Sequence, residues 1–575
     1  MRRFLLLLFA LGLPMSLMAN DAKLSPELRS NSGEKPVSVI VQYKSLPGNA
    51  HKDRIRLVRG TVGRELRLVK GLSAQLPAEA LASLSQDDSV AYISLDRPVQ
   101  SHMNNAAGAV LASYAWNTGL DGTGVGVAVI DSGIQNVDDL RDSSGRSRIV
   151  FSADFTGGDA SDLYGHGTHV AGIIGGNGKD SSCAACKVTI RGIAPNVNLI
   201  NLRALDANGV GSDSTVIAAI DTAIQLKDTY NIRVMNLSLG RPIYESYKLD
   251  PVCQAVEQAW KAGIVVVVSA GNDGRDTSLG TGGYGTVEAP GNDPYVITVG
   301  AANTKGTPDR GDDVMTSYSS KGPTALDAIV KPDLVAPGNR IVSLETQGTL
   351  VLSYPQNRIP FTYYTTALGR QSYSSDYFTL SGTSMATGIV SGTAALLLQQ
   401  DPALTPDQVK ARLMKTAYKG LPQYTTVVDG GAVFNIQSDA FTVGAGYLDV
   451  QAALSNDDLA QGRATSPTAY YDAGSGNVFF LADNSATWAP ATLWDPWLVW
   501  GGNVFLPPSS DWGNSAMWGS SAMWGNSAMW GNSAMWGNSA MWGNSAMWGN
   551  SAMWGNSAMW GNSAMWGNLA VTGEN

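Results

Sequence analysis

The sequence predicts an α/β fold, in which a parallel β-sheet is covered by helices on both faces. Short apolar runs alternate along residues 125–299 with longer segments whose apolar residues recur at helical spacing. The short runs are apolar almost throughout, which is the pattern of strands buried on both faces of a sheet. With 44% hydrophobic and 15% charged residues, the 575-residue chain has enough apolar surface for a large core, and a mostly disordered chain is excluded.

Each strand of the predicted sheet, and each covering helix, can be placed on the sequence. The apolar runs predict strands at residues 125–130, 197–205, 234–239, 264–269 and 295–299. Helical spacing predicts helices at residues 214–230, 251–262, 384–400 and 405–416. Active sites of parallel sheets lie at the carboxyl ends of the strands, so the residues that follow these strands are the candidates for function.

Residues 1–19 have the pattern of a secretory signal peptide. Arg2 and Arg3 precede an apolar run at residues 4–13, and the stretch ends in small residues up to Ala19. We therefore expect a secreted protein that is extracellular, periplasmic or held at the cell surface. A retained membrane anchor is the alternative, but the apolar run is shorter than the ~20 residues that span a bilayer, and no later uncharged run approaches that length.

Charge separates a small N-terminal segment from the rest of the chain. Residues 20–102 contain 12 Lys or Arg and 9 Asp or Glu, a net +3, whereas residues 103–575 contain 25 and 39, a net −14. Opposite net charges suggest two bodies that attract each other. Within the segment, the patterns predict strands at 37–43, 71–76 and 90–95 and helices at 52–68 and 78–84, a small α+β unit. The net charge of the whole chain, −9, excludes a general nucleic-acid binder.

The three cysteines are too few for a scaffold built on disulfides. Cys183 and Cys186 are separated by two alanines, so a disulfide between them would close only a short local loop. Whichever cysteines pair, Cys253 included, one thiol is left over, and the sequence leaves the pairing open. A zinc site is disfavoured because it usually needs four ligands.

Three residues with complementary chemistry stand at ends of the predicted elements. Asp131 ends the first strand in Ile-Asp-Ser-Gly, His166 lies between two glycines, and Ser384 starts an apolar helix. A serine hydroxyl needs a base to become a nucleophile, and an imidazole needs a carboxylate that fixes its tautomer and stabilises its cation. Beyond residue 103 the only histidines are His166 and His169, so the chain offers no other base of this kind.

The motifs around these residues resemble those of the subtilisin family of serine proteases. They are Asp-Ser-Gly at Asp131, Gly-His-Gly-Thr-His-Val-Ala-Gly at His166 and Gly-Thr-Ser-Met-Ala at Ser384, in the order Asp, His, Ser. The resemblance identifies residues 104–455 as a subtilisin-like catalytic domain that hydrolyses peptide bonds through an acyl-enzyme. It implies Ser384 as nucleophile, His166 as acid and base, and Asp131 as the group that orients His166. No cofactor is required for this chemistry; calcium is implied only as a structural ion, and no metal ligand is assigned.

The resemblance carries over residues that would hold the substrate. Ser-Ala-Gly-Asn implies that Asn272, next to Gly271, donates to the oxyanion together with the backbone N–H of Ser384. Asn-Leu-Ser-Leu-Gly implies that Ser238, Leu239 and Gly240 lie along an extended peptide substrate. Main-chain groups of Ser238 and Gly240 would bind this peptide as an added strand.

Two further residues receive roles by the same comparison. Glu288, in Val-Glu-Ala-Pro-Gly, falls near the floor of the primary specificity pocket. If Glu288 points inward, a basic residue before the scissile bond is favoured. His169 is expected to be a structural histidine and not a second base.

The sequence also departs from the family pattern at three places. Gly388 stands where the family usually has proline, which predicts a looser first turn of the helix after Ser384. Arg241 replaces a second glycine and puts a long cation beside the substrate strand. Residues 346–376 form an insertion that is expected to shape or cover the cleft.

The resemblance gives the basic N-terminal segment a role. Its size and position are similar to those of the family's propeptide, which assists folding and inhibits the enzyme by laying its end in the cleft. Residues 20–103 are therefore expected to be an inhibitory propeptide, removed by self-cleavage near residues 102–105. An ordinary N-terminal domain of the enzyme body is the alternative.

The end of the chain is a tryptophan repeat. From Trp512 to Trp566 a tryptophan recurs every six residues in the unit Met-Trp-Gly-Asn-Ser-Ala, which we assign to residues 512–568. An even period keeps Trp on one side of an extended chain and Met on the other. Stacked short strands and an unstructured aromatic tail both fit, and exposed Trp and Met would favour self-association or surface attachment. Residues 456–511 are expected to be a linker or a small β unit.

Two functions of different kinds follow from the sequence. The first is a secreted serine endopeptidase, made as an autoprocessed zymogen, whose partners are protein or peptide substrates and its own propeptide. No nucleic acid and no membrane span are expected. The second is an adhesive or surface-assembly protein, in which the repeats act and the protease-like body is inactive.

Overall fold

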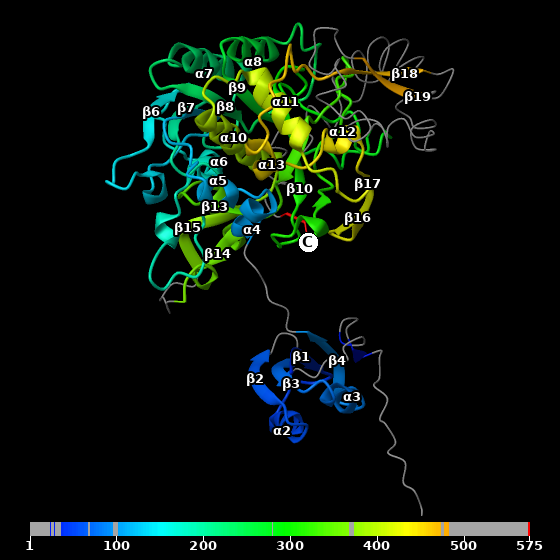
Figure 1. Ribbon diagram of the computed structural model, residues 1–575. Coiled ribbons are helices and arrows are strands. Elements are labelled where there is room, and N and C mark those ends of the chain that lie inside the picture. The colour runs from blue at the N-terminus through cyan, green and yellow to red at the C-terminus, as the bar shows by residue number, and fades with distance from the viewer. Residues whose placement is uncertain are drawn as a thin grey trace, which may run out of the picture. The chain divides into compact units, whose positions relative to one another are not determined.

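The computed structural model divides the chain into two compact units, Met1–Gln100 and Ser101–Asn575 (Figure 1). It describes residues 23–24, 28, 36–66, 70–95, 102–278, 280–366, 373–472, 477–481 and 573–574. The predicted signal peptide at 1–19 and the repeats at 512–568 lie outside these described residues, as do residues 482–511. The division between the units falls next to the predicted propeptide boundary at residue 103.

The first unit is a four-stranded antiparallel sheet with helices α2 and α3 among its described residues, the small α+β unit that the sequence predicts. Its strand order is β2-β3-β1-β4. Alternate residues of one strand, Val39 and Val41, are fully buried, and Ile55 of a helix is buried with them. The elements are β1 (Val37–Tyr43), α2 (Asn49–Leu57), β2 (Thr61–Leu66), β3 (Gly71–Leu76), α3 (Ala80–Ser85) and β4 (Val90–Leu95).

The prediction of a helix at residues 52–68 is wrong for the second half of that range. α2 ends at Leu57, and the chain returns as strand β2. Arg59 adopts a left-handed φ of 60°, which ends the helical path. Gly60 lies so close to β3 that an added Cβ would be 2.4 Å from a methyl of Leu76, so the turn needs glycine.

The second unit is built on an eight-stranded, mostly parallel sheet. Its order is β11-β10-β9-β8-β5-β7-β6, with β12 also paired to β10; β10 and β11 are antiparallel, and the other pairs are parallel. The strands are β5 (Gly126–Asp131), β6 (Ile149–Asp154), β7 (Asn198–Arg203), β8 (Ile232–Leu237), β9 (Val265–Ser269), β10 (Ile297–Asn303), β11 (Val314–Met315) and β12 (Leu334–Pro337). The predicted strands match β5, β7, β8, β9 and β10. β6 was not predicted because, as an edge strand, it exposes alternate residues and lacks the continuous apolar run.

Helices cover the sheet on both faces (Figure 1). α7 (Asp213–Gln225) packs against α8 (Pro251–Lys261), and α6 (His166–Gly175) packs against α10 (Thr383–Gln400). α10 also contacts β8, β9 and β10, so almost its whole length is buried. α6 was not predicted because nearly all of its residues are buried and no polar face reveals the helical period. No helix among the described residues combines the length and the hydropathy needed to cross a membrane.

The remaining elements surround this core. The chain enters through α4 (His102–Ala109) and α5 (Ser113–Asn117), and β13 (Ile341–Leu344), β14 (Arg358–Pro360) and β15 (Tyr373–Leu380) form a three-stranded antiparallel sheet next to α9 (Thr349–Ser353). After α10 follow α11 (Pro406–Thr416), the hairpin β16 (Tyr424–Asp429) and β17 (Ala432–Gln437), α12 (Ala440–Val443), α13 (Val450–Leu454), and the hairpin β18 (Thr468–Asp472) and β19 (Asn477–Leu481).

Residues 456–472 belong to the segment that was expected to be a linker or a small β unit. They pack onto the rest of the second unit. Ala460 and Ala464 are buried in one cluster with Met414 of α11. The N–H of Ser466 donates to the carbonyl of Pro294 at 2.9 Å. The β18–β19 hairpin then supplies a small β unit within the predicted 456–511 segment.

Candidate active site

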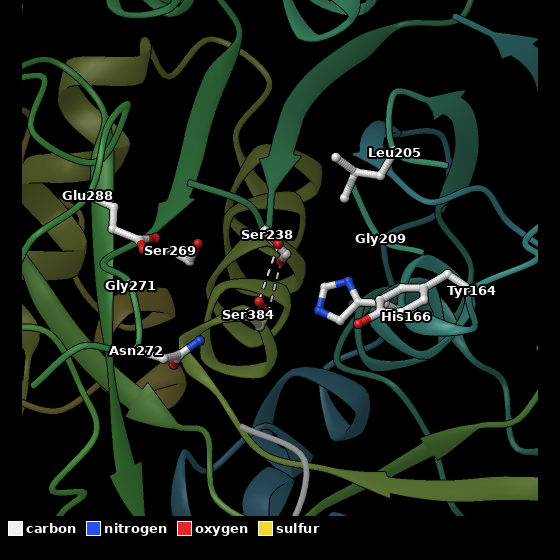
Figure 2. A pocket seen from close by; sticks show the side chains of 10 residues that line it. All are labelled: Tyr164, His166, Leu205, Gly209, Ser238, Ser269, Gly271, Asn272, Glu288 and Ser384. Carbon is white, nitrogen blue, oxygen red and sulfur yellow. Dashed lines mark hydrogen bonds between the residues drawn. The ribbon is translucent and has the colours of Figure 1, made fainter. Parts of the chain in front are cut away.

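A cleft of about 430 Å³ lies at the carboxyl ends of the central strands (Figure 2). β5 ends at Asp131, Ser238 follows β8, and Asn272 comes soon after β9. Because neighbouring parallel strands end at the same edge of the sheet, residues far apart in sequence meet here. The cleft is lined by Tyr164, His166, Leu205, Gly209, Ser238, Ser269, Gly271, Asn272, Glu288 and Ser384.

The predicted base and the carboxylate predicted to orient it are hydrogen-bonded to each other. Nδ1 of His166 lies 2.8 Å from Oδ1 of Asp131, and the side chain of Asp131 is 1% exposed. The N–H of Ser132 donates to the same oxygen at 2.7 Å. A buried carboxylate oxygen accepts hydrogen bonds, so Nδ1 carries the proton and Nε2 is left as the basic nitrogen.

The environment of His166 favours its protonated form. Burial alone lowers the pKa of His166, but the charge of Asp131 and its hydrogen bond, with the charge of Asp162, outweigh burial and raise the pKa above the ordinary 6.5. A base of this strength can take a proton from a hydroxyl and return it to a leaving amine near neutral pH.

A second buried carboxylate shapes the loop that carries His166. Asp162 accepts hydrogen bonds from Gly165 N at 2.7 Å, Thr168 N at 2.8 Å and Ser132 Oγ at 2.9 Å. These contacts tie the loop to the segment after Asp131. Asp162 is a functional residue without a predicted role, although its place four residues before His166 in a glycine-rich loop is a signal for one.

Ser384 lies in the first turn of α10, at the side of His166. Figure 2 shows the imidazole beside the serine, with one ring nitrogen on the serine side. The hydroxyl of Ser384 is turned to the carbonyl of Ser238, to which it donates at 3.2 Å. The hydroxyl therefore has to turn from this carbonyl toward His166 before the imidazole can take its proton.

Asn272 presents its amide nitrogen to the cleft (Figure 2). Its Oδ1 is occupied, because it accepts from the backbone N of Thr383 at 3.0 Å and from the hydroxyl of Thr383 at 3.2 Å. Nδ2 is thereby directed toward Ser384. The N–H of Ser384 belongs to the first turn of α10, whose N–H groups have no acceptor within the helix. Two donors therefore face the position next to the serine hydroxyl.

Glu288 points into the cleft, between two glycines. An added Cβ on Gly240 would lie 2.4 Å from Glu288 Oε2, and one on Gly271 would lie 2.8 Å from its Cγ. Only glycine at both positions leaves room for this carboxyl group. Glu288 therefore points inward, as the hypothesis of a basic residue before the scissile bond requires.

Asp273, which the sequence analysis missed, is hydrogen-bonded to Glu288. Burial and the charge of Asp273 raise the pKa of Glu288 well above the ordinary 4.5, and burial and the charge of Asp276 raise the pKa of Asp273 to about 6. Two acidic groups this close disfavour each other's ionised form, so the pair is expected to hold one shared proton to a pH above the ordinary range of a carboxyl group.

The substrate strand expected at Ser238, Leu239 and Gly240 directly follows β8. Leu239 and Gly240 line an adjoining, mostly apolar cavity of about 700 Å³. Arg241 lines the same cavity, and its guanidinium is held by Asp213 at 2.7 and 2.8 Å and by Asp250 at 2.9 Å. The long cation expected beside the substrate is therefore neutralised by two carboxylates.

Gly388 and the insertion at residues 346–376, the other two departures from the family pattern, leave the site intact. α10 runs through Gly388 without a break, and an added Cβ there would lie 3.1 Å from Ile173, so glycine lets α10 approach α6. The expected loosening of the helix is not what this glycine does. The insertion contributes α9, where the N–H groups of Thr349 and Leu350 donate to Leu163 and Tyr164, so it flanks the loop of His166.

The remaining candidate residues stand apart from the cleft. Nε2 of His169 lies 3.1 Å from the carbonyls of Ile341 and Phe378, and burial and the charge of His166 lower its pKa to about 3, as for a structural histidine. Cys183 and Cys186 form a disulfide, and Cys253 is a buried thiol. Among the described residues, no three or more His, Cys, Asp or Glu side chains are grouped so as to hold a metal ion, and calcium stays a prediction without ligands.

Comparisons with known proteins point to one family. A model described as the Subtilase family matches residues 122–446. Serine protease AprX of Bacillus subtilis (strain 168) is 35% identical over 417 residues, 69% of this chain and 87% of that protein. Subtilisin E of the same strain is 30% identical over 453 residues, 78% of this chain and 97% of that protein. The Extracellular serine proteinase of Thermus sp. (strain Rt41A) is 34% identical over 364 residues, 60% of this chain and 70% of that protein.

Proposed function

The chain belongs to the subtilase family and is a subtilisin-like serine protease, and we propose that Asp131, His166, Ser384 and Asn272 carry its chemistry. The observation that supports this assignment is the 2.8 Å contact between Asp131 and His166 in the cleft that Ser384 lines. Modification of Ser384 by a serine-directed covalent inhibitor, with loss of proteolysis, tests it. Labelling of another serine instead would contradict it.

In the first step the serine attacks the scissile carbonyl. The hydroxyl of Ser384 turns from the carbonyl of Ser238 to Nε2 of His166, which takes its proton as the Oγ–C bond forms. The carbonyl π electrons move to oxygen, and Asp131 stabilises the imidazolium. Nδ2 of Asn272 and the N–H of Ser384 donate to the new oxyanion, aided by the positive end of α10.

In the second step the peptide C–N bond breaks. The oxyanion electrons reform the carbonyl, and His166 gives its proton to the leaving amine, so an acyl-enzyme and a shortened peptide result. A water molecule then attacks the ester with His166 again as base. The C–Oγ bond breaks, the proton returns to Ser384, and the second product leaves as a carboxylic acid.

Replacing Asn272 by alanine is expected to lower kcat by about 10²–10³, as loss of the equivalent donor does in subtilisin. The amide donates to an oxyanion that exists only after attack, so KM should change little. Steady-state kinetics on a peptide substrate measure both constants. Asn272→Asp keeps an oxygen for Thr383 but removes the donor, and it should be at least as slow. A drop confined to KM would contradict the oxyanion role.

We propose that Glu288 and Asp273 direct cleavage after a basic residue. A lysine or arginine side chain that reaches the base of the cleft would meet the carboxyl group of Glu288, set between Gly240 and Gly271, with that of Asp273 next to it. A cation at this place favours loss of the shared proton, so both carboxyls can be charged when such a residue binds. An apolar residue gains nothing from the pair.

Glu288→Gln is expected to lower the preference for lysine over norleucine before the scissile bond by about thirtyfold or more, since losing one partner of a buried charge pair costs ~2 kcal/mol or more. The ratio of kcat/KM for two peptides that differ only at this residue measures it. Because the pair gains negative charge as pH rises, the parent's preference should grow from about pH 5 upward, and that of Glu288→Gln should grow less. Asp276→Asn keeps both carboxyl groups but removes a charge that raises the pKa of Asp273, so it should keep the preference and move its rise to lower pH. Equal cleavage of both peptides by the parent at every pH would remove the hypothesis.

We further propose that the chain is a secreted zymogen. Residues 1–19 would direct export, and residues 20–103 would be the inhibitory propeptide that the enzyme removes near residues 102–105. The separate α+β unit that ends at Gln100 supports this division. The relatives include a protein named as an extracellular serine proteinase, which is consistent with export.

A further inference from the structure

Gly573 and Glu574 are seated in the second unit, Ser101–Asn575, which we call the catalytic unit, next to Ser381 at the start of the Ser384 motif. Glu574 is 1% exposed, although it is acidic and lies 235 to 299 residues from its partners in the sequence. A carboxylate is rarely buried to this extent unless it is paired and hydrogen-bonded. We call the pocket that holds it the Arg275 slot, formed by Arg275, Ser317, Asn339 and Ser381.

The Arg275 slot matches both the charge and the backbone of its occupant. Oε1 of Glu574 accepts from Arg275 Nη2 at 2.8 Å, from the N–H of Ser317 at 2.9 Å, and from the hydroxyl of Ser317. The N–H of Glu574 donates to Asn339 Oδ1 at 2.8 Å, and Asn339 Nδ2 donates to the carbonyl of Glu574 at 2.9 Å. Asn339 therefore binds both the N–H and the carbonyl of Glu574, while Arg275 and Ser317 bind its carboxylate.

The position before the glutamate admits only glycine. Gly573 has a φ of 67°, a left-handed conformation that favours glycine. An added Cβ would lie 2.5 Å from Ser381 Oγ and 2.6 Å from Arg340 Cγ. Steric exclusion and the buried carboxylate contacts together define a Gly-Glu recognition site.

Arg275 is held in place by groups other than Glu574. Its Nε donates to Ser317 Oγ at 2.6 Å, its Nη2 also lies 2.8 Å from Asp429, and its guanidinium stacks over Phe434 at 4.5 Å. The hairpin β16–β17, which carries Asp429 and Phe434, thus forms the outer wall of the slot. Such a preformed cation needs little reorganisation to receive an acidic side chain.

We propose that the Arg275 slot is a binding site for a Gly-Glu peptide segment, and that Gly573–Glu574 of the chain itself is its occupant. The catalytic unit would then hold the chain at two places, at the β18–β19 hairpin, where Phe480 packs on Phe441 of α12 with ring centroids 5.7 Å apart, and at Glu574. Residues 482–572 separate these two points in the sequence.

Hydrogen exchange of the full chain tests the site, with Ser384→Ala present to prevent self-cleavage. The amides of Glu574 and Ser317 are both hydrogen-bonded within the slot, so these two amides should exchange slowly. Glu574→Ala should speed exchange of both by roughly tenfold or more. Glu257→Ala, which removes an acidic partner of Lys261 and no group of the slot, is the control and should leave the slow exchange of the Glu574 amide.

Two results would overturn the proposal. One is complete exchange of the Glu574 amide at the earliest time in the parent chain. The other is unchanged exchange at Ser317 in Glu574→Ala. In both cases protection of β8 and β9 reports whether the fold is intact, so loss of folding is told apart from an empty slot.

A peptide in trans tests recognition separately from connectivity. A Ser384→Ala chain that ends at Asn568 is mixed with the synthetic peptide Leu-Ala-Val-Thr-Gly-Glu-Asn at millimolar concentration. Slow exchange at Ser317 should return with this peptide and should not return when its glycine is alanine or its glutamate is glutamine. Equal recovery with all three peptides, or recovery with none, would contradict a Gly-Glu site.

Discussion

A Ser384→Ala chain is expected to lose about 10⁶ in kcat, the size of the loss measured when the nucleophile of subtilisin is removed. No other hydroxyl can form the acyl-enzyme from the position beside His166. Binding should survive, because Glu288, Asn272 and the strand after β8 are untouched. Hydrolysis of a peptide substrate by purified protein measures the loss, and active-site titration with a covalent inhibitor should fall to zero.

The same variant tests the zymogen proposal. If the chain cuts its own junction near residues 102–105, Ser384→Ala should persist at full length when no other protease is present, as mass spectrometry of the N-terminus would show. Ser391→Ala is the matched control: it lies on the same helix, is buried, and donates to Asn236 at 2.9 Å. It should mature and keep nearly parental turnover. Normal maturation of Ser384→Ala would refute self-cleavage.

Asp131→Asn is expected to reduce kcat by about 10⁴, as the equivalent change does in a serine protease triad. The amide can donate to Nδ1 of His166, which leaves the proton on Nε2, where the serine needs a base. The charge of Asp131 also raises the pKa of His166, so its loss should move the acid limb of the pH–rate profile to lower pH. Steady-state kinetics from about pH 5 to 9 measure both effects.

A matched control for this change is Asp154→Asn. Asp154 ends β6 at the same edge of the sheet and pairs with Arg203 at 3.6 Å, away from His166. Its replacement should leave the position of the acid limb unchanged. A parental kcat in Asp131→Asn would show that the 2.8 Å contact does not serve catalysis.

The elements that the sequence predicts best are those with a clear apolar pattern. β5, β8 and β9 are continuous apolar runs, and each was placed to within about two residues. α6 and β6 were missed for opposite reasons, because α6 is buried all round and β6 lies at a sheet edge. The turn at Arg59 and Gly60 depends on contact with β3, which a local pattern does not contain.

The residues of the candidate site also fall into those that a local pattern predicts and those that it does not. Asp131, His166 and Ser384 were identifiable because each sits in a short motif whose residue types suit one chemical task. Asp273 and Asp162 were missed because their importance comes from what burial brings beside them, Glu288 in one case and the loop of His166 in the other. The Arg275 slot unites residues 275 and 574, which no local pattern connects.

By itself the sequence determined which groups are present, in what order, and on which kind of element, since periodicity and motif chemistry are local properties of the chain. Only the tertiary structure decided which of these groups touch. Contact sets the strength of His166 as a base, the shared proton of Glu288 and Asp273, and the burial of Glu574, because desolvation and charge interactions act through space and not along the chain.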